Sequence, residues 1–366
     1  SSTAATTNGI LCGINILSGN ANVGTVTGNT FGSTTGTSSI YTCATATAGS
    51  VVGIYATTVN TITIKNNTFG AIDAMGTTAT LNGAITCINS AGTAGNFTIT
   101  NNTIGNATNP NLRTGNLTEG GNLSNIGSTF SAASGTGITR GILSGATGTV
   151  SIGTVAEPNI IRNFYNNSTG TGASMRGIEV TSGVGLVNGN QIYNFVSPSA
   201  NLTEATAGLA ILGILYSGTT TGCEVNDNRI YSLSLTNTGA VGTNVAGIGV
   251  ANATNIFVMR NFIYDLSNAS ITTTVTDPGT STGIFLRSGT TANTIANNMI
   301  SLGTGQSTNT TFIGIWNNNG SAPNPTYNIY YNTVFIGGTA SSGAQPSFGY
   351  VRGDLTTTAR TVAVDI

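Results

Sequence analysis

A Gly-Ile pair recurs along most of this chain, and this repeat constrains the fold more than any other feature. From Gly141 onward, successive pairs are separated by 36, 36, 34, 36 and 31 residues, and the variant Gly349-Tyr350 follows after another 35. The pairs begin at Gly13, Gly53, Gly141, Gly177, Gly213, Gly247, Gly283 and Gly314, and Ala84-Ile85 is a second variant. Self-similarity at a period of about 20 to 50 residues indicates stacked structural units.

A second signature, Asn-x-[Ile/Phe/Val], follows most of these pairs. It occurs at Asn29, Asn67, Asn102, Asn190, Asn228, Asn261, Asn298 and Asn332, with Asn159 as a degenerate copy. Because side chains alternate between the two faces of a strand, the apolar positions around the two signatures define three lanes. The lanes are the Ile after each Gly, the residue three before each Asn (from Val26 to Ile329), and the residue two after it (from Phe31 to Val334).

Three apolar lanes per unit predict a three-sided coil. One turn cannot bury its inner face alone, but stacked turns form a continuous core of like-on-like Ile and Val columns. We therefore expect an all-β fold, a single right-handed parallel β-helix of nine to ten rungs with three short strands per rung. We expect one domain over residues 1–366, with a long loop insertion at 105–139.

The Asn and Gly lanes have physical explanations of their own. Asn tolerates bend conformations, and its amide both donates and accepts, so stacked copies can form a hydrogen-bonded ladder along the axis. Glycine before the Ile suits a corner where a Cβ would clash or where φ is positive.

Composition excludes several kinds of chemistry. The chain has no histidine, which removes His-dependent nucleophile systems, His general bases and His-containing zinc sites. Charged residues are 6% of the total and the net charge is -1, so nucleic acid is a poor partner. No apolar run is long enough to span a membrane, and we expect no membrane insertion. No metal site, cofactor or nucleotide-binding loop is indicated.

The Gly-Ile lane, the segments "NNTI", "NQIY", "NRIY" and "NTVF", and the Thr/Ser/Gly-rich loops resemble the right-handed parallel β-helix repeats of large secreted or surface proteins of Bacteroidota. The resemblance implies type IX export, an extracellular or cell-surface location, and a role in adhesion or surface fibres. No sorting tail is visible, which suggests a segment of a longer protein. The open ends, including the final "TVAVDI", favour end-to-end stacking into fibres.

The segments between the strands vary in length. We expect polar loops at 32–50, 105–139, 196–210 and 267–281, and the longest of these contains Arg113 and Glu119. Loops of this kind carry binding functions in many folds, but a solvated and tolerant insertion is the favoured interpretation here.

Acidic residues are too dispersed to form an obvious catalytic centre. The densest cluster is Glu224, Asp227 and Asp265 with Arg229 and Arg260. Aligning the rungs on their Asn places Asp227 and Arg260 in one lane of adjacent turns, which predicts a surface ion pair rather than an active site.

Aromatic side chains are the best candidates for contact with a glycan or a protein partner. One predicted outward lane holds Tyr55, Leu143, Leu215, Phe285 and Trp316, and a second holds Tyr193, Tyr231, Tyr264 and Phe335. Stacking of these rings on one another within a structural ladder is the other interpretation, and it is the favoured one for the second lane.

The four cysteines lack metal-binding spacing. Cys87 and Cys223 fall at inward positions and are expected to be buried. Cys12 and Cys43 lie in one turn and could form a disulfide outside the cell.

These observations favour a non-catalytic structural or adhesive segment. The alternatives are a β-helix that binds or cleaves polysaccharide, which needs a cleft with several carboxylates, and an ice-binding solenoid. Thr61-Ile62-Thr63 and Thr98-Ile99-Thr100 suit the latter, but the pattern does not recur in later rungs.

Overall fold

The computed structural model describes most of the chain. The described residues are 11–36, 39–44, 50–76, 83–108, 110–117, 130–131, 137–202, 209–239, 242–272, 278–289, 293–318, 326–341 and 346–353. The two ends, including Ser1–Asn8 and "TVAVDI", and parts of every predicted loop, including Glu119, lie outside these ranges. End-to-end stacking therefore stays a prediction.

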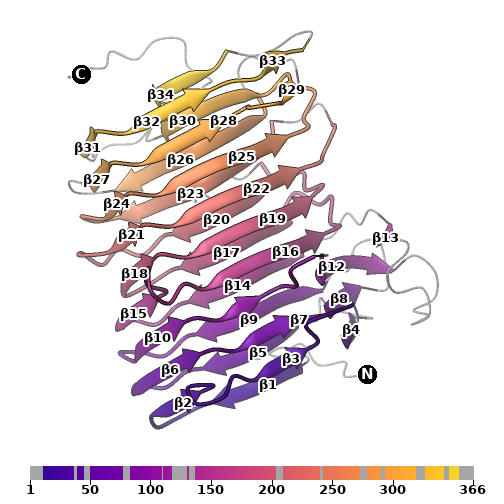
Figure 1. The fold of residues 1–366 in the computed structure, drawn as a ribbon, viewed down its shortest axis with the longest axis vertical. Helices are drawn as coiled ribbons and strands as arrows, with labels where there is room; N and C mark the ends of the chain where they lie inside the picture. The colour runs from indigo at the N-terminus through magenta and orange to yellow at the C-terminus, as the bar shows by residue number, and fades with distance from the viewer. Residues whose placement is uncertain are drawn as a thin grey trace.

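The described residues form a parallel β-solenoid with three sheets, and the strands of each sheet follow one another up the axis (Figure 1). The first sheet contains β1 (Leu11–Ile16), β5 (Ser50–Ala56), β9 (Ala84–Ser90), β14 (Ile138–Ser144), β17 (Ser174–Val180), β20 (Ile211–Tyr216), β23 (Asn244–Ala253), β26 (Thr280–Gly289), β30 (Thr311–Asn317) and β34 (Phe348–Arg352). The second contains β2 (Ala21–Val23), β6 (Thr61–Lys65), β10 (Asn96–Thr100), β15 (Thr149–Ile152), β18 (Val184–Asn188), β21 (Glu224–Asn226), β24 (Phe257–Met259), β27 (Asn293–Ala296) and β31 (Tyr327–Tyr330).

The third sheet contains β3 (Thr30–Gly32), β7 (Thr68–Gly70), β11 (Thr103–Ile104), β16 (Ile160–Asn166), β19 (Gln191–Ser197), β22 (Arg229–Leu235), β25 (Phe262–Asn268), β28 (Met299–Leu302) and β32 (Thr333–Ile336). One strand from each sheet makes a rung, which gives nine complete rungs before β34. The all-β parallel β-helix and its number of rungs are thus confirmed. The described residues include no helix, and hence none long and apolar enough to cross a bilayer.

Rungs stack in register, with like residues over like residues. In the first sheet Ile178 pairs with Ile214, and Ile214 with Ile248. The Ile lane of the third sheet behaves in the same way, since Ile192 pairs with Ile230 and is fully buried. Each fully buried Ile contributes about 2 kcal/mol, so these columns supply the main stabilisation of the fold.

Close packing explains the glycine lane. Gly213 lies between two paired positions of β20, and its missing side chain leaves room for an isoleucine of the third sheet. A Cβ at Gly213 would lie 2.6 Å from Cγ2 of Ile230 and 2.7 Å from the carbonyl oxygen of Gly247. Steric exclusion, rather than a positive φ, therefore selects glycine at this position.

Two lane assignments from the sequence are wrong. Val26 is 97% exposed, and Val23 pairs with Ile64 in its place, because extra residues separate β2 from Asn29. The partner of Ile54 in the next rung is Ile88, not Ile85. The Gly position of that rung is thus occupied by Cys87.

The Asn ladder is confirmed over all nine rungs. From Asn29 to Asn298, each side-chain Nδ2 donates to the Oδ1 of the next ladder Asn, at 2.8–3.0 Å. The degenerate copy at Asn159 takes part fully. Ladder residues from Asn67 to Asn298 are at most 1% exposed, so their amides replace water along an entire corner of the core.

Part of the predicted loop at 105–139 is sheet. β12 (Leu112–Leu117) extends the third sheet and pairs in parallel with β8 (Ile72–Gly76) and β16, while β4 (Ile40–Ala44) pairs with β8. A short antiparallel partner of β12 is β13 (Phe130–Ser131), and β29 (Ser307–Thr308) pairs with β33 (Thr339–Ala340). In Figure 1 the strands β4, β8, β12 and β13 project beside the lower rungs, whereas β29 and β33 lie near the upper end. Arg113 is buried there and donates from Nε to Oδ1 of Asp73 at 2.7 Å, so it anchors the extension rather than binding in solvent.

Buried cysteines match the prediction. Cys87 and Cys223 are buried free thiols, and burial raises the pKa of Cys87. Cys12 is also a free thiol, on β1 of the first sheet, whereas Cys43 lies on β4 beside the third sheet. A disulfide between Cys12 and Cys43 is therefore not formed in this structure.

Candidate functional site

The outer face of the third sheet carries the candidate aromatic residues. Two positions of each strand face outward here, on either side of the buried Ile lane. One lane runs through Arg162, Tyr193, Tyr231, Tyr264, Ser301 and Phe335, and the other through Gln191, Arg229, Phe262, Met299 and Thr333. The sequence lane from Tyr193 to Phe335 is thus correctly placed, with Ser301 as an interruption.

The three tyrosines form a stack, which we call the tyrosine ladder (Tyr193, Tyr231, Tyr264). Ring centroids of Tyr193 and Tyr231 are 4.6 Å apart with an interplanar angle of 8°, and those of Tyr231 and Tyr264 are 4.8 Å apart at 3°. Both faces of Tyr231 are therefore covered by neighbouring rings. Phe262 covers Tyr264 further, at 4.6 Å and 30°. A sugar ring that stacks on an aromatic face would have to separate these rings first.

Two arginines form hydrogen bonds with hydroxyl groups of the tyrosine ladder. Arg162 donates from Nη1 to the Tyr193 hydroxyl at 2.7 Å, and Arg229 donates from Nη2 to the Tyr264 hydroxyl at 2.6 Å. The Arg229 guanidinium carbon also lies 5.1 Å from the centroid of Tyr231, within cation–π range. Burial raises the pKa of Tyr231 above the ordinary tyrosine value of 10.0, so its phenol stays protonated at neutral pH.

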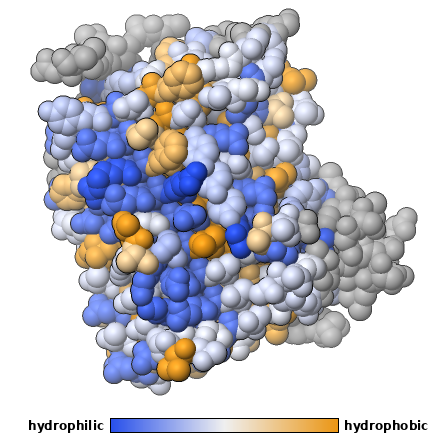
Figure 2. Space-filling model, in the orientation of Figure 1, coloured by the Kyte–Doolittle hydropathy of each residue, from blue (hydrophilic) through white to orange (hydrophobic). Residues whose placement is uncertain are grey.

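Exposed apolar side chains continue from the tyrosine ladder toward later rungs. Phe262 is 37% exposed, and Met299 and Phe335 are each 56% exposed. We call these three residues the apolar patch. The visible face in Figure 2 shows hydrophobic groups interleaved with hydrophilic ones rather than one continuous hydrophobic surface. An apolar patch of only three residues suits a contact of limited area with a partner.

The other aromatic lane is not available for binding as the sequence suggested. Phe285 is fully buried and Trp316 is 2% exposed, while Tyr55 is half-buried. Phe285 and Trp316 pack edge to face at 5.0 Å and join Leu212 and Leu215 in a second hydrophobic cluster. Trp316 also donates from Nε1 to the carbonyl of Gly353 at 2.9 Å. The lane does face away from the main core, but the expectation that Phe285 and Trp316 are exposed is wrong.

Carboxylates in the described part of the chain all have side-chain partners. The predicted surface pair is confirmed, since Arg260 donates to both carboxylate oxygens of Asp227 at 2.8 Å. Asp265 accepts from Ser232, and Glu224 accepts from amide groups. Among these residues no group of three His, Cys, Asp or Glu side chains could hold a metal ion. The local cluster thus consists of separate pairs along the rungs.

The threonine lane is short. On the outer face of the second sheet Thr63 pairs with Thr98, and the lane continues as Ser151, Leu186 and Glu224. A flat array of threonines therefore covers only two rungs, which gives no support to an ice-binding surface.

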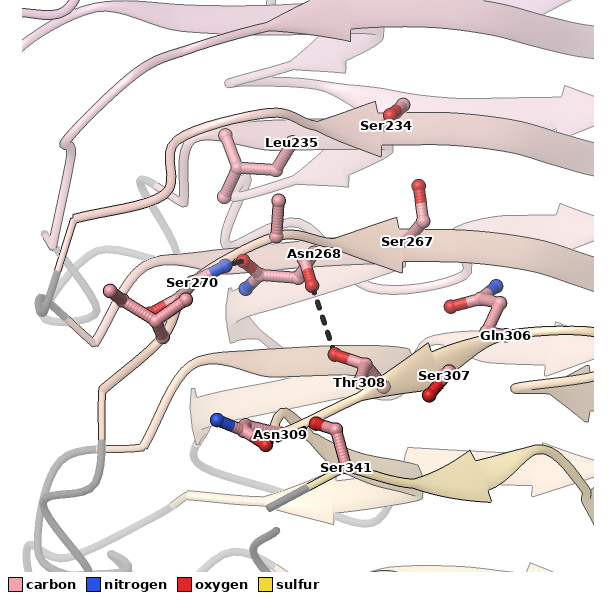
Figure 3. Close-up of a pocket in the computed structure, with 12 residues that line it drawn as sticks. Ser234, Leu235, Ser267, Asn268, Ser270, Gln306, Ser307, Thr308, Asn309 and Ser341 are labelled. Carbon is pink, nitrogen blue, oxygen red and sulfur yellow. Dashed lines mark hydrogen bonds between the residues drawn. The ribbon is translucent and has the colours of Figure 1, made fainter. Parts of the chain in front are cut away.

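The clefts of the described surface include the two that follow. The first, of about 410 Å³, lies at the edge of the third sheet and is lined by uncharged side chains such as Ser267, Gln306 and Asn309 (Figure 3). Thr308 donates there to the carbonyl of Asn268 at 3.3 Å. The lining of this cleft can form hydrogen bonds to a ligand but includes no carboxylate, lysine or histidine to act as a general acid or base.

A second cleft, of about 440 Å³, opens on the outer face of the first sheet. Its lining includes Arg140, Arg176 and Glu179, which the sequence analysis did not single out. A usable signal was present, because both arginines directly precede a lane glycine, at Gly141 and Gly177, in consecutive rungs.

Comparison of the chain with protein-family models, with curated proteins and with solved structures gives no match. The similarity to exported surface β-helices of Bacteroidota consequently remains a prediction from the residues quoted above.

Proposed function

We propose that this β-helix is a rigid, non-catalytic structural segment of an exported surface protein. The observation that carries this proposal is the axial continuity of the side-chain ladders. The Asn ladder links nine successive rungs, so bending or opening any rung breaks buried hydrogen bonds as well as backbone pairing. The tyrosine ladder adds ring stacking on the outside, at about 0.5–1.5 kcal/mol per pair.

The tyrosine ladder and the described carboxylates, the groups that could act on a polysaccharide, already have partners within the structure. The tyrosine ladder uses the faces of its rings internally, and Arg162 and Arg229 bind two of its hydroxyls. Of the six carboxylates in the described residues, four form ion pairs and two accept from neutral side chains. These contacts support a structural role over a hydrolytic one.

Force spectroscopy on the chain held at its two ends tests the structural role. A rung of 36 residues releases roughly 120–130 Å when extended, so we expect unfolding in steps of about that size or its multiples. Asn228→Ala should lower the force of the steps, and Asn328→Ala, an exposed site on the second sheet, should not. Equal forces for the two variants would contradict the proposal.

The non-catalytic and surface assignments have separate tests. Incubation with a panel of polysaccharides should release no new sugar ends. Release that Asp227→Asn or Glu179→Gln abolishes would establish catalysis instead. Antibody labelling of intact producing cells should detect the protein, and detection only after lysis would exclude a surface location.

Adhesion is the part of the proposal that the apolar patch supports, because these side chains are exposed beside a rigid sheet. Attachment to glycan-coated surfaces should fall in Phe335→Ser. Full attachment by that variant would remove the patch from the proposal.

A further inference from the structure

The charged cleft on the first sheet contains an unusual pairing of like charges. Arg140 on β14 lies directly over Arg176 on β17, and the same lane holds Thr86 in the rung before and Leu212 in the rung after. Like charges at directly paired positions of adjacent strands destabilise a sheet. Two stacked arginines between neutral neighbours therefore need compensation by negative charge.

Glu179 supplies only part of that compensation. Its carboxylate accepts a hydrogen bond from Nε of Arg140, and both side chains are largely buried, at 13% and 22% exposure. With Arg176 included, two guanidinium groups and one carboxylate line the cleft, which leaves a charge of +1 among its described residues. The other five carboxylates of the described residues each pair with one cation or accept hydrogen bonds from neutral side chains.

Arg176 combines deep burial with unused hydrogen-bonding capacity. It is 4% exposed, and its one hydrogen bond to the described residues runs from Nη1 to the carbonyl of Met175, at 2.8 Å. A guanidinium has five N–H donors, and arginine is almost never so deeply buried without a partner. Burial lowers the Arg176 pKa to about 10, so the group is still protonated at neutral pH. Arg176 lines a cleft of about 440 Å³, which can admit a small molecule.

We propose that this cleft binds the carboxylate of a small hydroxylated acid, with Arg176 as its main anchor and Arg140 as the second cation. A planar guanidinium suits a carboxylate because two parallel N–H groups match its two oxygens. Ser174 and Ser217 line the same cleft, and serine hydroxyl groups suit the hydroxyl groups of such a ligand. A single negative charge neutralises the excess of +1. A phosphate dianion would leave a net charge of -1 in the cleft, beside the Glu179 carboxylate, and should bind less well.

The ligand has two sources with this chemistry, a free hydroxy acid or an acidic sugar of a glycan. Calorimetric titration of the full chain with lactate, glucuronate, glucose and inorganic phosphate separates them. We expect glucuronate or lactate to bind, glucose to fail, and phosphate to bind more weakly. Tighter binding of glucuronate assigns the site to acidic sugars, and equal or tighter binding of lactate assigns it to free hydroxy acids. Binding of glucose as tight as that of glucuronate, preference for phosphate, or no binding by any acid would overturn the proposal.

Variants with opposite expected effects locate the binding in this cleft. Arg176→Met should weaken binding of the acid about tenfold or more, and Arg260→Met, at an exposed pair on another part of the surface, should leave it unchanged. Glu179→Gln should raise the affinity for the carboxylate and improve binding of phosphate, because it leaves the cleft with a charge of +2. If Arg176→Met fails to fold, Arg140→Gln serves as the second variant. Unchanged affinity in the folded variants of Arg176 or Arg140, or weaker binding in Glu179→Gln, would refute the assignment.

Discussion

Removal of one amide from the Asn ladder should destabilise the β-helix locally and by a large amount. Asn228→Ala loses two hydrogen bonds that its Oδ1 accepts from Asn190, one from the backbone nitrogen at 2.9 Å and one from Nδ2 at 3.0 Å. It also loses the bonds from its own Nδ2 to the carbonyl of Val187 at 2.9 Å and to Oδ1 of Asn261 at 3.0 Å. Four bonds at about 0.5–1.5 kcal/mol each give a loss of roughly 2–6 kcal/mol.

Hydrogen exchange and chemical denaturation measure this effect at two scales. Because each rung of a solenoid contacts mainly its neighbours, faster exchange should be concentrated in the strands β18, β19, β21 and β22. The decrease in the free energy of unfolding that Asn228→Ala causes, measured by urea denaturation, should lie within the range above. Asn328→Ala, whose side chain is exposed, should change stability by no more than about 0.5 kcal/mol.

A double variant tests whether the ladder acts as a connected unit. Asn228→Ala and Asn261→Ala both remove the bond between these two side chains, so the combined loss should be smaller than the sum by about 0.5 kcal/mol or more. Strict additivity, or an Asn228→Ala cost as small as that of Asn328→Ala, would refute the reasoning that buried axial bonds stabilise this fold.

Two further predictions concern sterics and pH. Gly213→Ala should lower the unfolding temperature, because its Cβ would lie 2.6 Å from Ile230, whereas Gly349→Ala meets nothing within 4 Å and should be neutral; equal effects would contradict the packing argument. Hydrogen bonds from Lys65 and Thr100 lower the Glu157 pKa below its ordinary value of 4.5. The contribution of the ionised Glu157 to folding stability is present above its unfolded-state pKa and is lost as the pH falls through its folded-state pKa. Lys65→Met should therefore make stability depend less on pH in that region of an acid unfolding curve. An unchanged curve would contradict this prediction.

The sequence determined the solenoid because nearly every rung repeats the same pattern of Gly, Ile and Asn residues. The Ile lanes, the Asn ladder and the Asp227–Arg260 pair all follow from period-two alternation combined with in-register stacking. Errors occurred where the spacing changed, as at Val26 and Ile85, since a repeat assigned by sequence offset cannot register an insertion between strand and corner.

Tertiary structure alone decided which outward side chains meet solvent. The lane positions of Phe285, Trp316 and Arg176 could be assigned from the sequence, but the burial of Phe285 and Trp316 depends on apolar neighbours from other rungs of the first sheet. The same holds for Arg113, which the sequence placed in a polar loop and which the extension of the third sheet buries against Asp73. Periodic sequence fixes what stacks along the axis, because those contacts are local and identical. The covering of the outer faces arises from contacts between unlike segments, whose geometry exists only in the folded chain.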